Sequence, residues 1–106
     1  MARYQFVVYS NPAAGLDAEY NAWYSGTHMQ QILALPGVVS ARRFKLAALQ
    51  LREDAPAHQY LAIYEIETED LATFIDELMK RAIDGRIQRS AALAPDALPM
   101  FWQAIE

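Results

Sequence analysis

Residues 59–85, QYLAIYEIETEDLATFIDELMKRAIDG, contain two hydrophobic periods in succession. In residues 59–67 apolar and aromatic side chains alternate on two sides of the chain, which predicts a strand. The apolar residues that follow have the i, i+3, i+4, i+7 spacing of one helix face. Thr68 is the expected N-cap of this helix, and Gly85 is expected to close it. The face consists of Leu71, Phe74, Ile75, Leu78, Met79 and Ala82.

Three further strands are expected, over residues 4–10, 38–46 and 100–105. A helical region separates the first two, so the element order is β-α-β-β-α-β. This is the ferredoxin-like arrangement of the α+β class, in which both helices cover one face of a four-stranded antiparallel sheet. The length of 106 residues suits one domain, so residues 1–106 are expected to form a single one.

The helical region between the first two strands is expected to be interrupted. Asp17 is the expected N-cap of its first part, and Gly26 is expected to end that part as a C′ residue. Thr27 and Gln30 have the spacing of a capping box, so a second short helix should begin at Thr27. It should end at Leu35, because a proline and a glycine follow.

Both faces of three expected strands carry apolar groups. Residues 4–9, 60–64 and 100–102 place apolar or aromatic side chains at successive positions, and therefore on both sides of the sheet. A sheet face that meets water should be polar, so the face without helices requires a cover. The economical cover is a second copy, which predicts a homodimer enclosing an aromatic-lined space for a small hydrophobic or aromatic ligand.

Composition excludes several classes of function. The chain has nine basic and thirteen acidic residues, a net charge of −4, which argues against a nucleic-acid partner. The absence of cysteine excludes disulfides, a thiolate nucleophile, iron–sulfur clusters and cysteine zinc sites. No apolar run reaches the roughly 20 residues of a membrane span. The N-terminal residues do not resemble a signal peptide, so a cytoplasmic location is expected.

No cofactor or metal is expected from the motifs. The glycines are isolated, so neither a phosphate loop nor a dinucleotide fingerprint is present, and no serine nucleophile elbow occurs. His28 and His58 are thirty residues apart and form no local ligand pair.

His28 is the strongest candidate for a catalytic residue. In the first turn of the second short helix, the positive helix end would disfavour the imidazolium form. A neutral imidazole can accept a proton, as a general base must. Tyr24 is four residues earlier and could orient the imidazole or polarise a carbonyl. Alternatively, His28 bonds a loop carbonyl and only fixes the junction between the two helices.

Five further residues are candidates for substrate binding: Trp23, Arg43, Tyr60, Tyr64 and Trp102. Aromatic residues at helical spacing, as at Trp23, are more commonly part of a core. Tyr60 and Tyr64 share one strand face and could line a pocket or pack across a dimer interface. Arg42 and Arg43 point to opposite faces, and the one that faces inward could bind a carboxylate or stabilise an enolate.

Two motifs resemble EthD-like proteins of the dimeric α+β barrel superfamily. They are EYNAWY at residues 19–24, with His28 following, and LPGVVSARRF at residues 35–44. The resemblance extends over residues 4–105. It implies a ferredoxin-like protomer, a barrel-forming dimer, and a place for His28 at the mouth of a pocket. The superfamily includes cofactor-independent enzymes such as muconolactone isomerases, polyketide cyclases and quinol monooxygenases.

Together these observations predict a cofactor-independent enzyme of the isomerase, cyclase, lyase or monooxygenase type. Its substrate would be a small apolar oxygenated or aromatic metabolite, with His28 transferring a proton and Tyr24 stabilising an oxyanion. The alternative is a non-catalytic binding or accessory protein for a hydrophobic metabolite or a partner oxygenase. A third reading, with less support in the residues, is a haem-binding variant in which His28 ligates iron.

Overall fold

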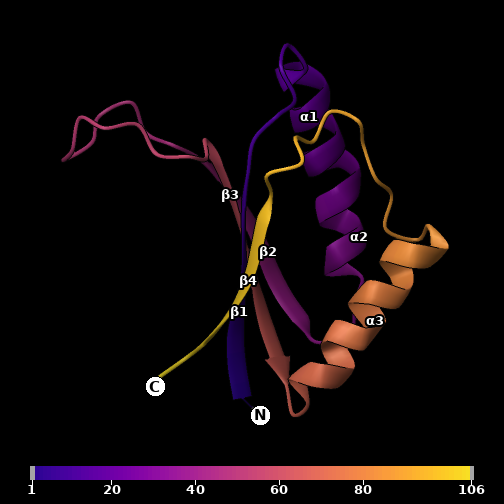
Figure 1. The fold of residues 1–106 in the computed structure, drawn as a ribbon. Helices are drawn as coiled ribbons and strands as arrows, with labels where there is room; N and C mark the ends of the chain where they lie inside the picture. Colours follow the sequence, from indigo (N-terminus) through magenta and orange to yellow (C-terminus); the bar gives the residue numbers. More distant parts are fainter. Residues whose placement is uncertain (1, 106) are drawn as a thin grey trace.

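The computed structural model describes residues 2–105, which form a four-stranded antiparallel sheet with helices on one face (Figure 1). The strand order is β2-β3-β1-β4, so the predicted ferredoxin-like β-α-β-β-α-β arrangement is confirmed. The elements are β1 (Ala2–Ser10), α1 (Asp17–Trp23), a π-helical turn η1 (Tyr24–His28), α2 (Met29–Leu33), β2 (Val38–Lys45), β3 (Tyr60–Thr68), α3 (Leu71–Asp84) and β4 (Leu98–Gln103).

Helix α3 begins at Leu71, two residues later than an N-cap at Thr68 predicts. Thr68 is still part of β3, and Asp70 is the N-cap, with an extended backbone at φ −138°. Its carboxylate accepts hydrogen bonds from the amide and the hydroxyl of Thr73. Gly85 ends the helix in the left-handed region at φ +89°, as predicted, because a residue without Cβ adopts this conformation without strain.

The region from Asp17 to Leu33 is one continuous helix, and the predicted interruption is wrong. Gly26 lies inside the π-helical turn, and Thr27 does not cap a new helix. Asp17 is the first helical residue rather than the N-cap. The backbone on both sides of the turn is right-handed helical, so the chain passes through it without a break.

The core lies between the sheet and the helices. Phe6 of β1 stacks on Phe101 of β4 with ring centroids 4.4 Å apart, and it tilts against Tyr64 of β3 at 5.6 Å. Phe74 of α3 meets Phe101 edge-on. Ile66 and Tyr64 are each 1% exposed. The side of the sheet that carries these residues is therefore packed against the protein's own helices.

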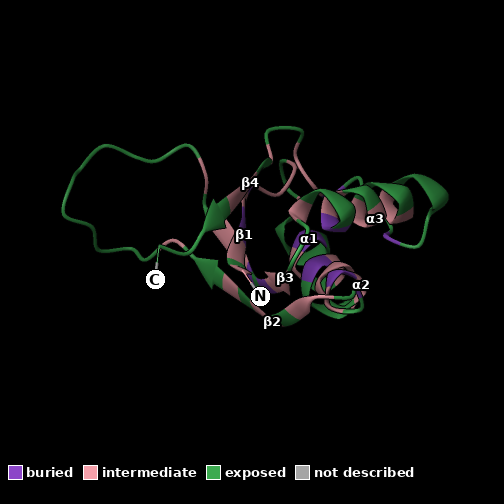
Figure 2. Cartoon of the chain, turned by 90° about the horizontal axis from the view of Figure 1, so that it is seen from below, coloured by how far each residue is buried: buried purple, intermediate pink, exposed green. Residues whose placement is uncertain are grey.

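We call the opposite side of the sheet the open face, because no helix of residues 2–105 covers it (Figures 1 and 2). Strand register places mostly apolar side chains there, and some of them are well exposed, such as Trp102 at 55%. Arg42 also lies on this face, opposite Ile63. The apolar members of the open face are Val7, Tyr9, Phe44, Leu61, Ile63, Leu98, Met100 and Trp102.

The loop of residues 46–59 projects from the end of β2 and β3 on the side of the open face (Figures 1 and 2). Asn11 fixes its base, because its amide donates to the carbonyl of Ala57 at 2.8 Å and accepts from the amide of Gln59 at 2.9 Å. Leu49 and Leu51 of this loop are exposed to solvent. A cavity of about 510 Å³ lies between the loop and the end of the open face.

None of the helices in residues 2–105 combines the length and the apolar character that crossing a membrane requires.

Candidate functional site

The π-helical turn positions His28 among aromatic rings. The amide of Met29 donates to the carbonyl of Tyr24, five residues earlier, which is the hydrogen bond that defines a π turn. Trp23 and His28 are also five residues apart, and their rings stack with centroids 4.5 Å apart. The Tyr24 ring meets the His28 imidazole edge-on at 4.9 Å. Trp23 in turn donates its indole N–H to the carbonyl of Gln88.

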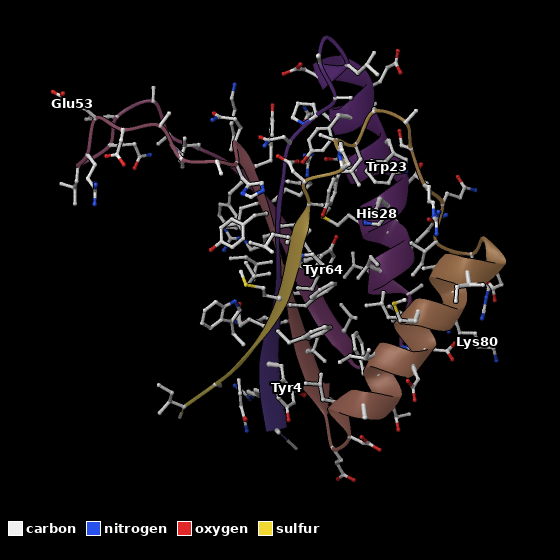
Figure 3. All side chains as sticks on the ribbon, in the orientation of Figure 1. Tyr4, Trp23, His28, Glu53, Tyr64 and Lys80 are labelled. Atoms are coloured by element: carbon white, nitrogen blue, oxygen red, sulfur yellow. The ribbon has the colours of Figure 1, made fainter. Side chains whose placement is uncertain are left out.

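Three buried polar atoms in this region have no hydrogen-bond partner: the hydroxyl oxygens of Tyr24 and Tyr64 and Nδ1 of His28. We call them the buried polar trio. Tyr64 reaches from the sheet toward the helical layer that holds Trp23 and His28 (Figure 3). The two hydroxyls approach each other closely enough for a weak hydrogen-bond contact that lowers the pKa of Tyr24 and raises that of Tyr64, but their geometry falls short of a regular hydrogen bond. Burial without a partner costs about 1–3 kcal/mol per group.

All three groups are neutral near pH 7, and burial moves their pKa values further from the range in which they would ionise. Desolvation, together with the positive charge of Arg43, lowers the pKa of His28 to about 4. Desolvation raises the pKa of Tyr24 to about 12 and raises the pKa of Tyr64 as well. The neutral imidazole predicted from the sequence is therefore supported, but the cause is different. His28 lies inside a continuous helix, so the helix terminus invoked for it does not exist.

Arg43 faces the helices, whereas Arg42 lies on the open face. The Arg43 guanidinium donates to the hydroxyl of Ser25 at 2.7 Å and to the side-chain oxygen of Asn21 at 3.0 Å. Its central carbon lies 4.5 Å from the centroid of the Tyr24 ring, within the range of a cation–π interaction. Arg43 therefore joins β2 to the helix and stands next to the buried polar trio.

Tyr20 and Tyr60 complete the aromatic cluster but have hydrogen-bond partners. The hydroxyls of Tyr20 and Ser10 share a hydrogen bond, and Tyr20 is fully buried, as a core residue would be. The amide of Asn21 donates to the hydroxyl of Tyr60 at 3.2 Å. Asn21 therefore contacts Arg43 and Tyr60 rather than His28.

Six of the seven candidate residues lie on the helix-facing side of the sheet. Trp102 does not, because it projects from β4 on the open face opposite Gln5. Lys45 is not among the seven candidates. It is two residues after Arg43 in β2 and therefore lies on the same face of the sheet, so strand alternation could have pointed to it. The six that come together are Trp23, Tyr24, His28, Arg43, Tyr60 and Tyr64.

Within the described part of the chain, residues 2–105, no group of three or more His, Asp or Glu side chains is placed to hold a metal ion.

Replacing a hydroxyl of the buried polar trio should not cost stability. Tyr64→Phe removes an unpaired buried group, so we expect the free energy of unfolding to stay equal or to rise by up to about 1 kcal/mol. Tyr20→Phe is the matched control, because it removes a hydroxyl bonded to Ser10. It should lower stability by about 1 kcal/mol. Urea unfolding of both variants checks this, and a loss for Tyr64→Phe as large as the control's would show that its hydroxyl is paired.

No protein-family model matches this chain, and no curated protein matches it. Several solved structures do. An EthD-like protein from Ralstonia eutropha has a TM-score of 0.68 and 15% identity, covering 100% of this chain and 95% of that one. A dimeric ferredoxin-like protein from Thermobifida fusca has a TM-score of 0.62 and 12% identity, covering 97% and 92%. SnoaB, a cofactor-independent oxygenase from Streptomyces nogalater, has a TM-score of 0.58 and 18% identity, covering 98% and 94%.

At these identities the comparisons define the fold. The chain has an EthD-like, ferredoxin-like fold, and the resemblance found in its sequence is confirmed at that level.

Proposed function

We propose that the protein is a small enzyme that acts without a cofactor on an apolar molecule carrying a ring oxygen or carbonyl. The buried polar trio supports this proposal, because two hydroxyls and an imidazole nitrogen without partners can bind a polar atom of a ligand. The surrounding rings of Trp23, Tyr20 and Tyr60 suit an aromatic or polyketide-like body. The similarity of fold to a cofactor-independent oxygenase supports the class of enzyme.

In this proposal His28 removes a proton from the carbon next to the carbonyl. Its imidazole is neutral at pH 7 and its Nδ1 has no partner, so a lone pair is available if that nitrogen is the unprotonated one. The negative charge that develops on the substrate oxygen favours the imidazolium and raises the pKa of His28 during the reaction. Tyr24 and Tyr64 keep their protons and donate hydrogen bonds to that oxygen.

We further propose that the functional unit is a homodimer formed through the open face. An apolar sheet face as large as this one is rarely left in water by a monomer. The fold neighbour from Thermobifida fusca is described as dimeric. The loop of residues 46–59 projects on the same side and would contact the second copy. A role in the breakdown of aromatic compounds in the cytoplasm fits this proposal.

Exchange of carbon-bound hydrogen tests the proposed chemistry without knowledge of the substrate. The probe is 2-tetralone in D₂O, whose hydrogens next to the carbonyl are replaced by deuterium when a base removes them. We expect the wild type to accelerate this exchange and His28→Gln to lose about 10²-fold or more of the acceleration. His58→Gln is the matched control, because it changes the other histidine, and it should exchange at the wild-type rate.

Two results would contradict the proposed enzyme. Equal exchange rates for the wild type and His28→Gln would remove His28 from the chemistry. Binding of 2-tetralone without any acceleration, with binding lost in His28→Gln, would favour the alternative of a binding or accessory protein.

A further inference from the structure

A second cavity opens beside the candidate site, at the end of β2. Its volume is about 360 Å³, and it is lined by Asn21, Arg43, Phe44, Lys45 and Tyr60. The guanidinium of Arg43, which lines this cavity, lies over the Tyr24 ring at 4.5 Å from its centroid. The same ring meets the imidazole of His28 edge-on, so Tyr24 connects the arginine of the cavity with the candidate site.

The charges lining this cavity are both positive. Arg43 and Lys45 contribute cations, and no acidic residue is among the lining residues. In the part of the chain from 2 to 105, neither Arg43 nor Lys45 takes part in an ion pair, although the protein carries a net charge of −4. Two uncompensated cations around one cavity attract an anion.

Arg43 also has donors to spare. A guanidinium has five N–H groups. Arg43 directs one to the hydroxyl of Ser25 and one to the side-chain oxygen of Asn21, both neutral acceptors. These two bonds fix the plane of the guanidinium, and the remaining N–H groups can bind a carboxylate in the two-pronged geometry that suits arginine.

Two aromatic side chains, Phe44 and Tyr60, also line this cavity. The Tyr60 ring lies 5.7 Å from the guanidinium carbon of Arg43. A ligand whose carboxylate reaches Arg43 would thus place an adjoining flat ring against Tyr60 or Phe44. Phosphate, which has no ring, would use the cations alone.

We propose that Arg43 and Lys45, with Asn21 holding the guanidinium, form a subsite for the carboxylate of an aromatic carboxylic acid. This inference rests on the proposed function in one respect, that the same ligand extends to the buried polar trio. It names the substrate class as an aromatic acid. The subsite itself is defined by its own residues and requires no turnover.

Benzoate is the probe, and benzamide, which has the same shape without the charge, is the reference ligand. Binding is followed by NMR titration of the wild type at low ionic strength. We expect benzoate to shift the resonances of residues around Arg43, and benzamide to leave them in place. Arg43→Gln should weaken benzoate at least about tenfold, as loss of a charged hydrogen bond predicts. Arg42→Gln, the adjacent arginine on the open face, is the matched control and should bind benzoate as the wild type does.

Lys45→Glu is a second test variant, which keeps the proposal testable even where Arg43→Gln fails to fold. Its own fold should be unaffected, because Lys45 is exposed and outside the packed cluster. It should abolish benzoate binding by replacing attraction with repulsion. Equal binding of benzoate and benzamide, equal loss in the Arg43 and Arg42 variants, or full binding by Lys45→Glu would each overturn the subsite.

The benzoate titration and the 2-tetralone exchange, both run on the wild type, separate this inference from the proposed function. Benzoate binding without hydrogen exchange in 2-tetralone would leave the subsite standing and reject the enzyme, whereas exchange without benzoate binding would reject the subsite alone.

Discussion

Ile63→Lys should convert the proposed homodimer to a monomer, raising the dimer dissociation constant by at least about 10³-fold. Ile63 is at the centre of the open face, paired with Val7 of β1 and Arg42 of β2. In the dimer its side chain would be covered by the second copy. A lysine ammonium buried there without a partner costs several kcal/mol, and about 4 kcal/mol corresponds to a factor of about 10³. The neighbouring charge of Arg42 adds repulsion.

Ile83→Lys is the control for this substitution. Ile83 is in α3, is 77% exposed, and belongs to the helical layer on the other side of the sheet. Sedimentation velocity over a range of concentrations should show a dimer for the wild type and Ile83→Lys, and a folded monomer for Ile63→Lys. A monomeric wild type, or a dimer that survives Ile63→Lys, would show that the open face is not the interface.

Acidification should destabilise the wild type through His28, by up to about 3 kcal/mol between pH 6.5 and pH 4. The pKa of His28 is lowered to about 4 in the folded protein from an ordinary value of 6.5, because the ring is desolvated. As the pH falls below 6.5, the unfolded chain binds a proton that the folded protein does not. The contribution to stability is therefore complete above pH 6.5 and is lost as the pH falls toward 4.

Urea unfolding at a series of pH values measures this loss. His28→Gln cannot bind the proton and should show a correspondingly flatter pH dependence. Nitrogen NMR of the imidazoles provides a direct check, since His28 should remain neutral at pH 5 in the folded protein. A His28 that titrates near pH 6.5 would show that the ring is not desolvated.

The layout of the sheet and of α3 could be predicted because local and tertiary preferences agree there. The alternation in β3 and the helical spacing after Leu71 each fit one structure only. At Thr68 and Asp70 the sequence offers two capping residues two positions apart. The choice between them depends on where β3 stops pairing with β1, and Thr68 still pairs with Ala2.

The helix that carries the site was harder to predict, because its local signals conflict with its packing. Gly26 and Thr27 have the chemistry of a helix end and a helix start. Yet Tyr20, Tyr24 and Ile32, on both sides of them, are all buried in the core. A continuous helix keeps those three residues on the side that faces the core. Gly26 fits inside this helix, because its backbone there does not have a positive φ.

The sequence located His28 and Tyr24 correctly beside each other but could not orient the arginines. Alternation places Arg42 and Arg43 on opposite faces without saying which face meets the helices. That assignment depends on register, in which Arg43 lies opposite the buried Ala62 and Arg42 lies opposite Ile63. Partners such as Ser25 arise from the fold and leave no local pattern.

The π-helical turn holds one residue more than an α-helical turn would. Deleting one residue between Trp23 and His28 would return the turn to α-helical winding and leave the two halves of the helix in their present orientation. Trp23 and the imidazole would then be four residues apart and still neighbours on one helix face. The same deletion within α1 or α2 would instead rotate one half against the other by about 100° and carry the imidazole away from its partners. The turn is thus the one place in this helix where an ancestral gene gains or loses a codon without moving the imidazole.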